Sequence, residues 1–266
     1  MSSNAFFEIN RQSLRAYYGQ NLTFYPHFHP GLELFYCLHG QTKVVVEDKE
    51  KLLNPGEMAV AWPNHVHSYA AIGETRYIIA IVDLNQVHEY AGLIAQHSCL
   101  NPFLQKEDVH PDILHCMETL AQNSAAGDQL RRAYLGVMIG RLLERLPLGE
   151  RRRPVAHDSL RELITYIDAH IAEPISLQLL AKELYLNKYY ISKMFSQRIG
   201  CSLRTYVNAI RIDRACAMLT DPNTALPDIL DACGFESERT FYRAFMAQRG
   251  MTPKAFREQA IGEKPR

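Results

Sequence analysis

The stretch "ISLQLLAKELYLNKYYISKMFSQRIG", Ile175 to Gly200, decides the fold of the C-terminal half of the chain. It predicts a helix that is capped by Ser176 and a second helix, from residue 188 to residue 198, that is capped by Asn187. The apolar residues of the second helix share one side, so its basic and hydroxyl-bearing residues face outward. This pattern is typical of a helix-turn-helix whose second helix enters the major groove of DNA.

A second copy of the pattern, "LPDILDACGFESERTFYRAFMAQRG", spans Leu226 to Gly250. Gly234 falls in its turn, Ser237 caps its second helix, and the two copies lie about 50 residues apart. Between them, residues 203–219 predict a helix about 25 Å long. A spacer of that length can place two recognition helices about 34 Å apart, which is one turn of B-DNA. A single match would be weak, because many helical pairs look alike, but two copies in register predict DNA binding.

The residues expected to contact DNA are the outward-facing ones of the two second helices. In the first module they are Lys188, Tyr189, Tyr190, Ser192, Lys193 and Gln197. In the second module they are Glu238, Arg239, Thr240, Tyr242 and Arg243.

The charge of the chain is divided between its halves, although the net charge is zero. Residues 1–150 hold 11 Lys and Arg against 16 Asp and Glu, whereas residues 151–266 hold 18 against 13. The excess of +5 in the second half indicates a polyanionic partner there. No run of about 18 apolar residues is present, and the N-terminus does not resemble a signal peptide, so we expect no membrane contact and a cytoplasmic protein.

The first half alternates between short apolar segments and turns up to about residue 109, which predicts a small antiparallel barrel or sandwich. Beyond it the pattern becomes helical, and residues 128–146 carry a broad apolar face. That face packs either against its own barrel or against a second copy of the chain, and periodicity does not decide between the two. A Pro-, Gly- and Arg-rich stretch, "LPLGERRRPVAHDS", then predicts a linker.

Histidines gather in the stretch "YPHFHPGLELFYCLHG", Tyr25 to Gly40. His27 and His29 share a strand face, which Glu33 continues, and His67 lies after the only tryptophan, Trp62. Three imidazoles and a carboxylate could hold Fe(II), Mn, Ni, Cu or Zn, or they could line a pocket without a metal. We predict the pocket, with no cofactor or metal, and Trp62 either stacks on its ligand or packs in the core.

Residues 160–258 resemble the DNA-binding domain of the AraC/XylS family of bacterial transcription regulators. The matching segments are "LAKEL", "YYISKMF", "TYVNAIRIDRACAML", "GFESERTFYRAF" and "GMTPKAFR". Two positions depart from the family pattern: Tyr185 stands where a turn glycine is usual, and Leu230 where a small alanine is usual. The spacing His-x-His-x3-Glu-x6-Gly resembles the first motif of the cupin barrel, and by that alignment His67 matches the second motif.

Together these features predict an α+β chain of two domains that is not an enzyme. Residues 1–148 form a cupin-like, antiparallel sensor domain whose helical segment, 109–146, serves dimerisation; 149–158 form a linker; and 159–266 form an all-α domain with modules at 176–198 and 226–249. The effector, a sugar or related metabolite, contacts His27, His29, Glu33, Trp62 and His67. The resemblance implies an activator whose partners are double-stranded DNA, the small-molecule effector, a second copy of the chain and RNA polymerase. The alternatives are a metal-dependent cupin enzyme fused to a DNA-binding domain and a regulator controlled by a protein partner.

Overall fold

The computed structural model describes residues 14–122, 127–150 and 159–262. They form two compact units, which within these ranges comprise residues 14–150 and residues 159–262, and each is described by itself. Of the expected linker, 149–158, only residues 149 and 150 are described, and they belong to a short strand. The prediction of an antiparallel, sheet-rich N-terminal domain and a helical C-terminal domain is confirmed.

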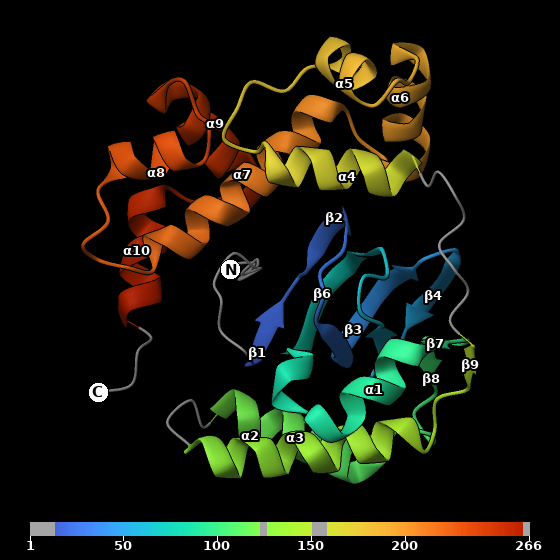
Figure 1. The fold of residues 1–266 in the computed structure, drawn as a ribbon. Coiled ribbons are helices and arrows are strands. Elements are labelled where there is room, and N and C mark those ends of the chain that lie inside the picture. The colour runs from blue at the N-terminus through green and yellow to red at the C-terminus, as the bar shows by residue number, and fades with distance from the viewer. Residues whose placement is uncertain (1–13, 123–126, 151–158, 263–266) are drawn as a thin grey trace. The chain divides into compact units, whose positions relative to one another are not determined.

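The N-terminal unit is built on a seven-stranded antiparallel sheet in the order β1-β6-β3-β5-β8, with β2 paired to β6 and β4 to β3 (Figure 1). Its strands are β1 (Leu14–Gln20), β2 (Thr23–His27), β3 (Leu32–Val46), β4 (Lys49–Leu53), β5 (Met58–Ala61), β6 (His67–Val82) and β8 (Phe103–Leu104). A separate pair joins β7 (His97–Cys99) to β9 (Leu148–Glu150). The helical elements of this unit are the 3-10 turn η1 (Leu84–Gln86), α1 (His88–Gln96), α2 (Pro111–Gln122) and α3 (Asp128–Leu143).

The two faces of the sheet carry different kinds of buried side chain. Because side chains alternate along a strand, Leu34 of β3 and Ile78 of β6 point to the helices, where they pack with Met138 of α3. On the other face Phe35 is stacked between two tyrosines, with ring centroids 4.8 Å from Tyr69 and 5.1 Å from Tyr77. Both faces are therefore core, and the same alternation places the buried carboxylate of Glu33 on the second face.

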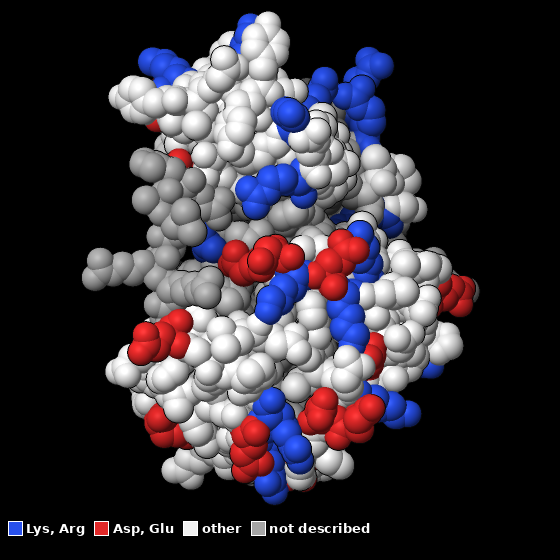
Figure 2. Space-filling view, turned by 90° about the vertical axis from the view of Figure 1, so that its right-hand side faces the viewer, with Lys and Arg blue, Asp and Glu red and all other residues white. Residues whose placement is uncertain are grey.

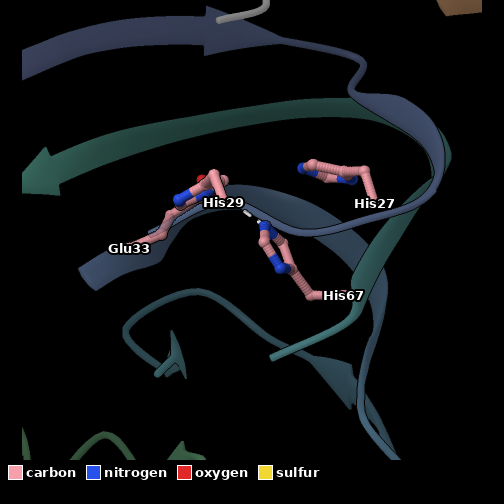
Figure 3. Close-up of side chains that lie close together, drawn as sticks. All are labelled: His27, His29, Glu33 and His67. Atoms are coloured by element: carbon pink, nitrogen blue, oxygen red, sulfur yellow. Dashed lines mark hydrogen bonds and ion pairs between the residues drawn. The ribbon is translucent and has the colours of Figure 1, made fainter. Parts of the chain in front are cut away.

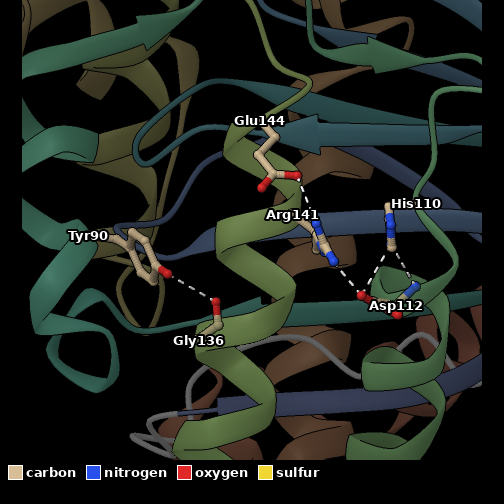
Figure 4. A network of polar contacts seen from close by, with 6 residues as sticks. All are labelled: Tyr90, His110, Asp112, Gly136, Arg141 and Glu144. Carbon is tan, nitrogen blue, oxygen red and sulfur yellow. Dashed lines mark hydrogen bonds and ion pairs between the residues drawn. The ribbon is translucent and has the colours of Figure 1, made fainter.

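Polar contacts fix α3 against the neighbouring helices (Figure 4). The Arg141 guanidinium donates from Nε to Asp112 of α2 at 3.0 Å and from Nη1 to Glu144 at 3.2 Å. The Tyr90 hydroxyl of α1 donates to the carbonyl oxygen of Gly136 at 3.2 Å. The contacts of Arg141 with Asp112 and of Tyr90 with Gly136 thus join α3 to α2 and α1.

The structure divides the broad apolar face predicted for residues 128–146. Met138, Leu142 and Leu146 are buried in the core of the N-terminal unit. Leu130 and Val137 are 52% and 48% exposed, respectively. Packing against its own sheet thus accounts for most of the face, and two apolar residues stay open to solvent in this chain.

The C-terminal unit is all-helical, with the long helix α7 running between two smaller helical groups (Figure 1). Its elements are α4 (Ser159–Ala169), α5 (Leu177–Glu183), α6 (Lys188–Met194), the π-helical turn η2 (Phe195–Ile199), α7 (Leu203–Leu219), α8 (Leu226–Ala232), α9 (Glu238–Arg249) and α10 (Pro253–Gly262). Tyr206, in the first half of α7, contacts the ring of Phe195 at 5.5 Å. Ile212 and Leu219, in its second half, lie in the core with Phe241 of α9. The first half of α7 therefore packs with the first module and its second half packs with the second module.

Local signals place the helix starts where the sequence predicts them, whereas the second helix, expected over residues 188–198, is α-helical only to Met194 and continues as the π-helical turn η2. The side chains of Ser176 and Asn187 accept hydrogen bonds from the backbone N–H groups of residues 179 and 189, and Ser237 caps α9 in the same way. Tyr185 adopts a positive φ of 53° in the turn where the family prefers glycine. Gly234 has a φ of 73° in the matching turn of the second module.

Candidate sensor site and DNA-binding surface

Four of the five residues predicted to contact an effector lie together in the N-terminal unit (Figure 3). His27 ends β2, His29 lies in the following loop, Glu33 is in β3, and His67 begins β6. One potential ligand atom from each lies within 4.8 Å of the others. The antiparallel register places His27 opposite His67, which brings segments 40 residues apart to one point.

Glu33 is the centre of this cluster and is fully buried. Its Oε1 accepts a hydrogen bond from the Tyr69 hydroxyl, and its Oε2 lies 3.0 Å from His29 Nε2 and 3.5 Å from His67 Nε2. Burial by itself would raise the pKa of this carboxyl. The charge of His67 and the hydrogen bonds from both histidines outweigh burial, so the pKa lies well below its usual range and the group is a carboxylate.

The outer nitrogens of two histidines are held by backbone carbonyls. His27 Nδ1 lies 2.9 Å from the carbonyl oxygen of Tyr25, and His67 Nδ1 lies 2.9 Å from that of His65. A carbonyl oxygen can only accept, so Nδ1 is the donor in both contacts. Burial, followed by the charge of His67, holds the pKa of His27 well below its usual range, which keeps that ring neutral.

The structure does not bring Trp62 to the cluster. Its side chain lies among the residues that pack against the helices, and its Nε1 donates to the carbonyl oxygens of Ile94 and His97 at 3.0 Å and 2.8 Å. The indole therefore serves packing and helix attachment, one of the two roles considered for it. The sequence reasoning missed Tyr69, although its position two residues after His67 puts both side chains on one face of β6.

The predicted DNA-contacting residues lie on the surface of the two modules. Ten of the eleven are exposed, and Thr240 is half-buried at the start of α9. Tyr189 and Tyr190 are 73% and 49% exposed, which is unusual for aromatic side chains. Figure 2 shows lysine and arginine side chains on the part of the C-terminal unit that faces the viewer. The surface combines positive charge, hydroxyl groups and exposed rings, which suits a nucleic acid.

A groove of about 960 Å³ lies between the two modules. Ser192 of α6 and Thr240 of α9 face it, together with Arg204 near the start of α7. The N-cap serines of α7 and α9, Ser202 and Ser237, also line it. The groove thus connects the two helices expected to read DNA.

Comparison with known protein families matches both units. An AraC-like ligand binding domain matches residues 12–136, and a helix-turn-helix domain matches residues 180–259. The chain belongs to the AraC family. This AraC-family chain is accordingly a DNA-binding transcription regulator with a ligand-binding domain.

Relatives agree with this assignment along the length of the regulator. The uncharacterized HTH-type transcriptional regulator YobQ of Bacillus subtilis is 23% identical over 243 residues, which covers 91% of this chain and 92% of YobQ. The regulatory protein SoxS of Escherichia coli is 30% identical over 100 residues, 38% of this chain and 94% of SoxS. Among solved structures, ToxT from Vibrio cholerae matches 92% of this chain and 98% of its own at 14% identity, with a TM-score of 0.54. A second ToxT structure, bound to an unsaturated fatty acid, is similar at 12% identity with the same TM-score. These structural likenesses concern the fold alone.

No helix in the described ranges has both the length and the apolar character needed to cross a lipid bilayer.

Proposed function

We propose that this AraC-family regulator activates transcription by reading two successive major grooves of DNA, and that a small effector bound at His27, His29, Glu33 and His67 controls this activity. The observation that carries the DNA-binding part is the pair of capped second helices, α6 and α9, in one domain with α7 between them. We place the effector on the face of the sheet that carries Glu33, because buried polar groups converge there. ToxT bound to an unsaturated fatty acid supports a small molecule as the class of effector.

Affinity and specificity have separate sources in this proposal. Lysines and arginines such as Lys188 and Arg239 contact phosphates and supply most of the affinity. Side chains in the first halves of α6 and α9, with Tyr189 and Arg243 foremost, contact base edges. The effector acts by binding one arrangement of the two domains more tightly than another.

The partners follow from the same scheme. A homodimer of the regulator presents four modules to paired sites on double-stranded DNA in the cytoplasm, and contact with RNA polymerase carries the activation. The exposed Leu130 and Val137 of α3 support a role for this helix in the dimer.

The test begins with selection of binding sites from random duplex DNA by the full-length protein. We expect enriched sequences with two contacted segments about 10 base pairs apart. Fluorescence anisotropy on the selected DNA then measures affinity between low and moderate salt, where it should fall steeply because phosphate contacts release counterions. No enrichment, or an affinity that salt does not change, would contradict the proposal.

Metal-dependent catalysis is the alternative that the histidine cluster favours. Turnover of a small substrate by the full-length protein, lost in His29→Ala, would support it. DNA binding that responds to an effector, without turnover, supports the regulator.

A further inference from the structure

Tyr185, in the turn between α5 and α6, is not among the residues expected to contact DNA, but it stands out by its backbone conformation and its exposure. We propose that its side chain contacts the sugar-phosphate backbone of DNA at the edge of the major groove that α6 enters, with the hydroxyl group donating a hydrogen bond to a phosphate oxygen. This contact positions the first module on the duplex. The inference deepens the proposed function and rests on it for the entry of α6 into the groove.

The backbone of Tyr185 lies in a region that residues with a side chain disfavour. Its φ of 53° is in the left-handed region, where the Cβ of an L-residue comes close to the following carbonyl oxygen. Within the described ranges three other non-glycine residues have a positive φ, and two of them are asparagines, which tolerate it. Tyrosine has no such tolerance, so a glycine at this position would be less strained.

The second module has the same turn with a glycine in this place. In both turns two successive N–H groups donate back to the end of the preceding helix, from Tyr185 and Leu186 at 3.4 Å and 3.0 Å and from Gly234 and Phe235 at 3.1 Å and 2.9 Å. A Cβ on Gly234 would lie 2.7 Å from the carbonyl oxygen of Ala172, so the second turn requires glycine. The first turn is open to solvent at Tyr185, which is why it accommodates a side chain.

The fold gains almost nothing from the side chain of Tyr185. The residue is 96% exposed, the highest value among the exposed large apolar residues of the described ranges. A ring that buries almost none of its surface contributes no hydrophobic stabilisation to offset the strained backbone. The strain and the exposure together point to contact with a partner.

The position of Tyr185 favours DNA as that partner. The turn leads into Asn187, the N-cap of α6, and the first two residues of α6 are Lys188 and Tyr189. Tyr189 is 73% exposed, and the Lys188 ammonium lies 5.1 Å from the centre of its ring. When the start of α6 lies in the major groove, the residues just before it lie beside the strand that borders the groove. Tyrosine hydroxyl groups are among the groups that contact phosphates there, and the charge of Lys188 favours the same polyanion.

The test compares Tyr185→Phe and Tyr185→Gly with the wild-type sequence in the full-length protein, by anisotropy on the selected DNA. Tyr185→Phe removes only the hydroxyl group and should weaken binding about 10-fold, at the lower end of what a hydrogen bond to a charged group contributes. Tyr185→Gly removes the whole side chain and should weaken binding at least as much. In urea unfolding followed by circular dichroism, Tyr185→Gly should be no less stable than wild type, because glycine adopts a positive φ freely.

The directions of the two effects separate a DNA contact from a structural role. If Tyr185 only held the turn in place, Tyr185→Gly would lower both stability and DNA affinity, whereas a contact with DNA lowers affinity alone. A hydroxyl group is neutral, so neither variant should change the dependence of affinity on salt concentration. Lys188→Ala removes a charge that contacts phosphate, and it should reduce that salt dependence by about one counterion.

Tyr166→Phe is the matched control, because Tyr166 lies in α4, outside the two modules, and its ring stacks on His170 at 4.1 Å. It should bind the selected DNA as wild type does. Wild-type affinity in Tyr185→Phe overturns the inference, as does an equal loss of affinity in Tyr166→Phe. A destabilisation of Tyr185→Gly that accounts for its loss of binding overturns it as well.

The behaviour of the wild-type protein separates this inference from the proposed function. Absence of DNA binding by the wild-type protein overturns the proposed function and this inference with it. Salt-sensitive binding by the wild-type protein, together with unchanged binding by Tyr185→Phe, overturns the inference alone.

Discussion

A buried ion pair joins the spacer helix to the second recognition helix, and its removal gives a sharp test of the C-terminal unit. Arg249 at the end of α9 donates from Nη2 to Oδ1 of Asp213 in α7. The two residues are 8% and 4% exposed. Asp213→Ala leaves the guanidinium buried without its carboxylate.

The expected loss of stability in Asp213→Ala follows from the burial of the pair. Breaking a buried pair by removing one partner costs about 3–5 kcal/mol, because an uncompensated charge stays in the core. With a denaturant dependence of about 1.5 kcal/mol per molar urea, the midpoint of unfolding should fall by about 2–3 M. Replacing both partners, in Asp213→Leu with Arg249→Met, should be much less harmful, because apolar residues of similar volume leave no unpaired charge.

The assay follows the two units separately in the full chain. Trp62 is the only tryptophan, so its fluorescence reports on the N-terminal unit, whereas far-ultraviolet circular dichroism reports mainly on helices. We expect the dichroism transition of Asp213→Ala to move to lower urea and the fluorescence transition to stay. Glu258→Ala is the control, since its pair with Lys254 spans 4.0 Å between side chains 67% and 85% exposed. Glu258→Ala should change the free energy of unfolding by no more than about 0.5 kcal/mol. A loss below about 1 kcal/mol in Asp213→Ala would refute the reasoning.

Three further substitutions test the two modules. Arg243→Ala should weaken binding to the selected DNA by about 1–3 kcal/mol, as anisotropy measures, without changing the urea transitions. Ser237→Ala removes the acceptor for the Thr240 N–H and should lower the stability of the C-terminal unit by about 1 kcal/mol in urea unfolding. Gly234→Ala should lower the stability of the C-terminal unit by more than about 1 kcal/mol. The residue has a φ of 73°, and a Cβ there would lie 2.7 Å from the carbonyl oxygen of Ala172. An unchanged stability in Gly234→Ala would show that the turn does not require glycine.

In the C-terminal unit the starts of α5, α6 and α9 could be predicted from the sequence, whereas the change from α6 to a π-helical turn at Phe195 could not. These helices begin at side chains that satisfy free N–H groups, and these caps act between residues two or three positions apart. The spacer was expected at residues 203–219, and α7 has those bounds. Such local chemistry is fully visible in a sequence.

The N-terminal unit could be predicted only in its class, because its strand order depends on contacts between distant segments. No local signal places β1 beside β6 or β2 at the start of β6. The prediction that His27, His29 and Glu33 lie together agrees with the structure, but they come from β2, the following loop and β3 rather than from one strand face. Alternation within a strand did not show which face of the sheet receives Trp62, since that depends on how β5 is paired. Tyr69 was missed for a different reason, since its parity with His67 was available but tyrosine carries no strong signal for a site.

The position of the cluster explains how a ligand there can influence the rest of the regulator. A ligand shifts an equilibrium only if it binds two states with different affinity. Within the described sheet β2 pairs with β6 alone, and its register is irregular between Phe24 and His27. An effector held by His27, Glu33 and His67 would join β2 to β3 and β6 through side chains as well as through this interrupted ladder. It would therefore stabilise the arrangement in which β2 is docked over any in which β2 has moved, and β2 is the element through which we expect occupancy of the site to be transmitted.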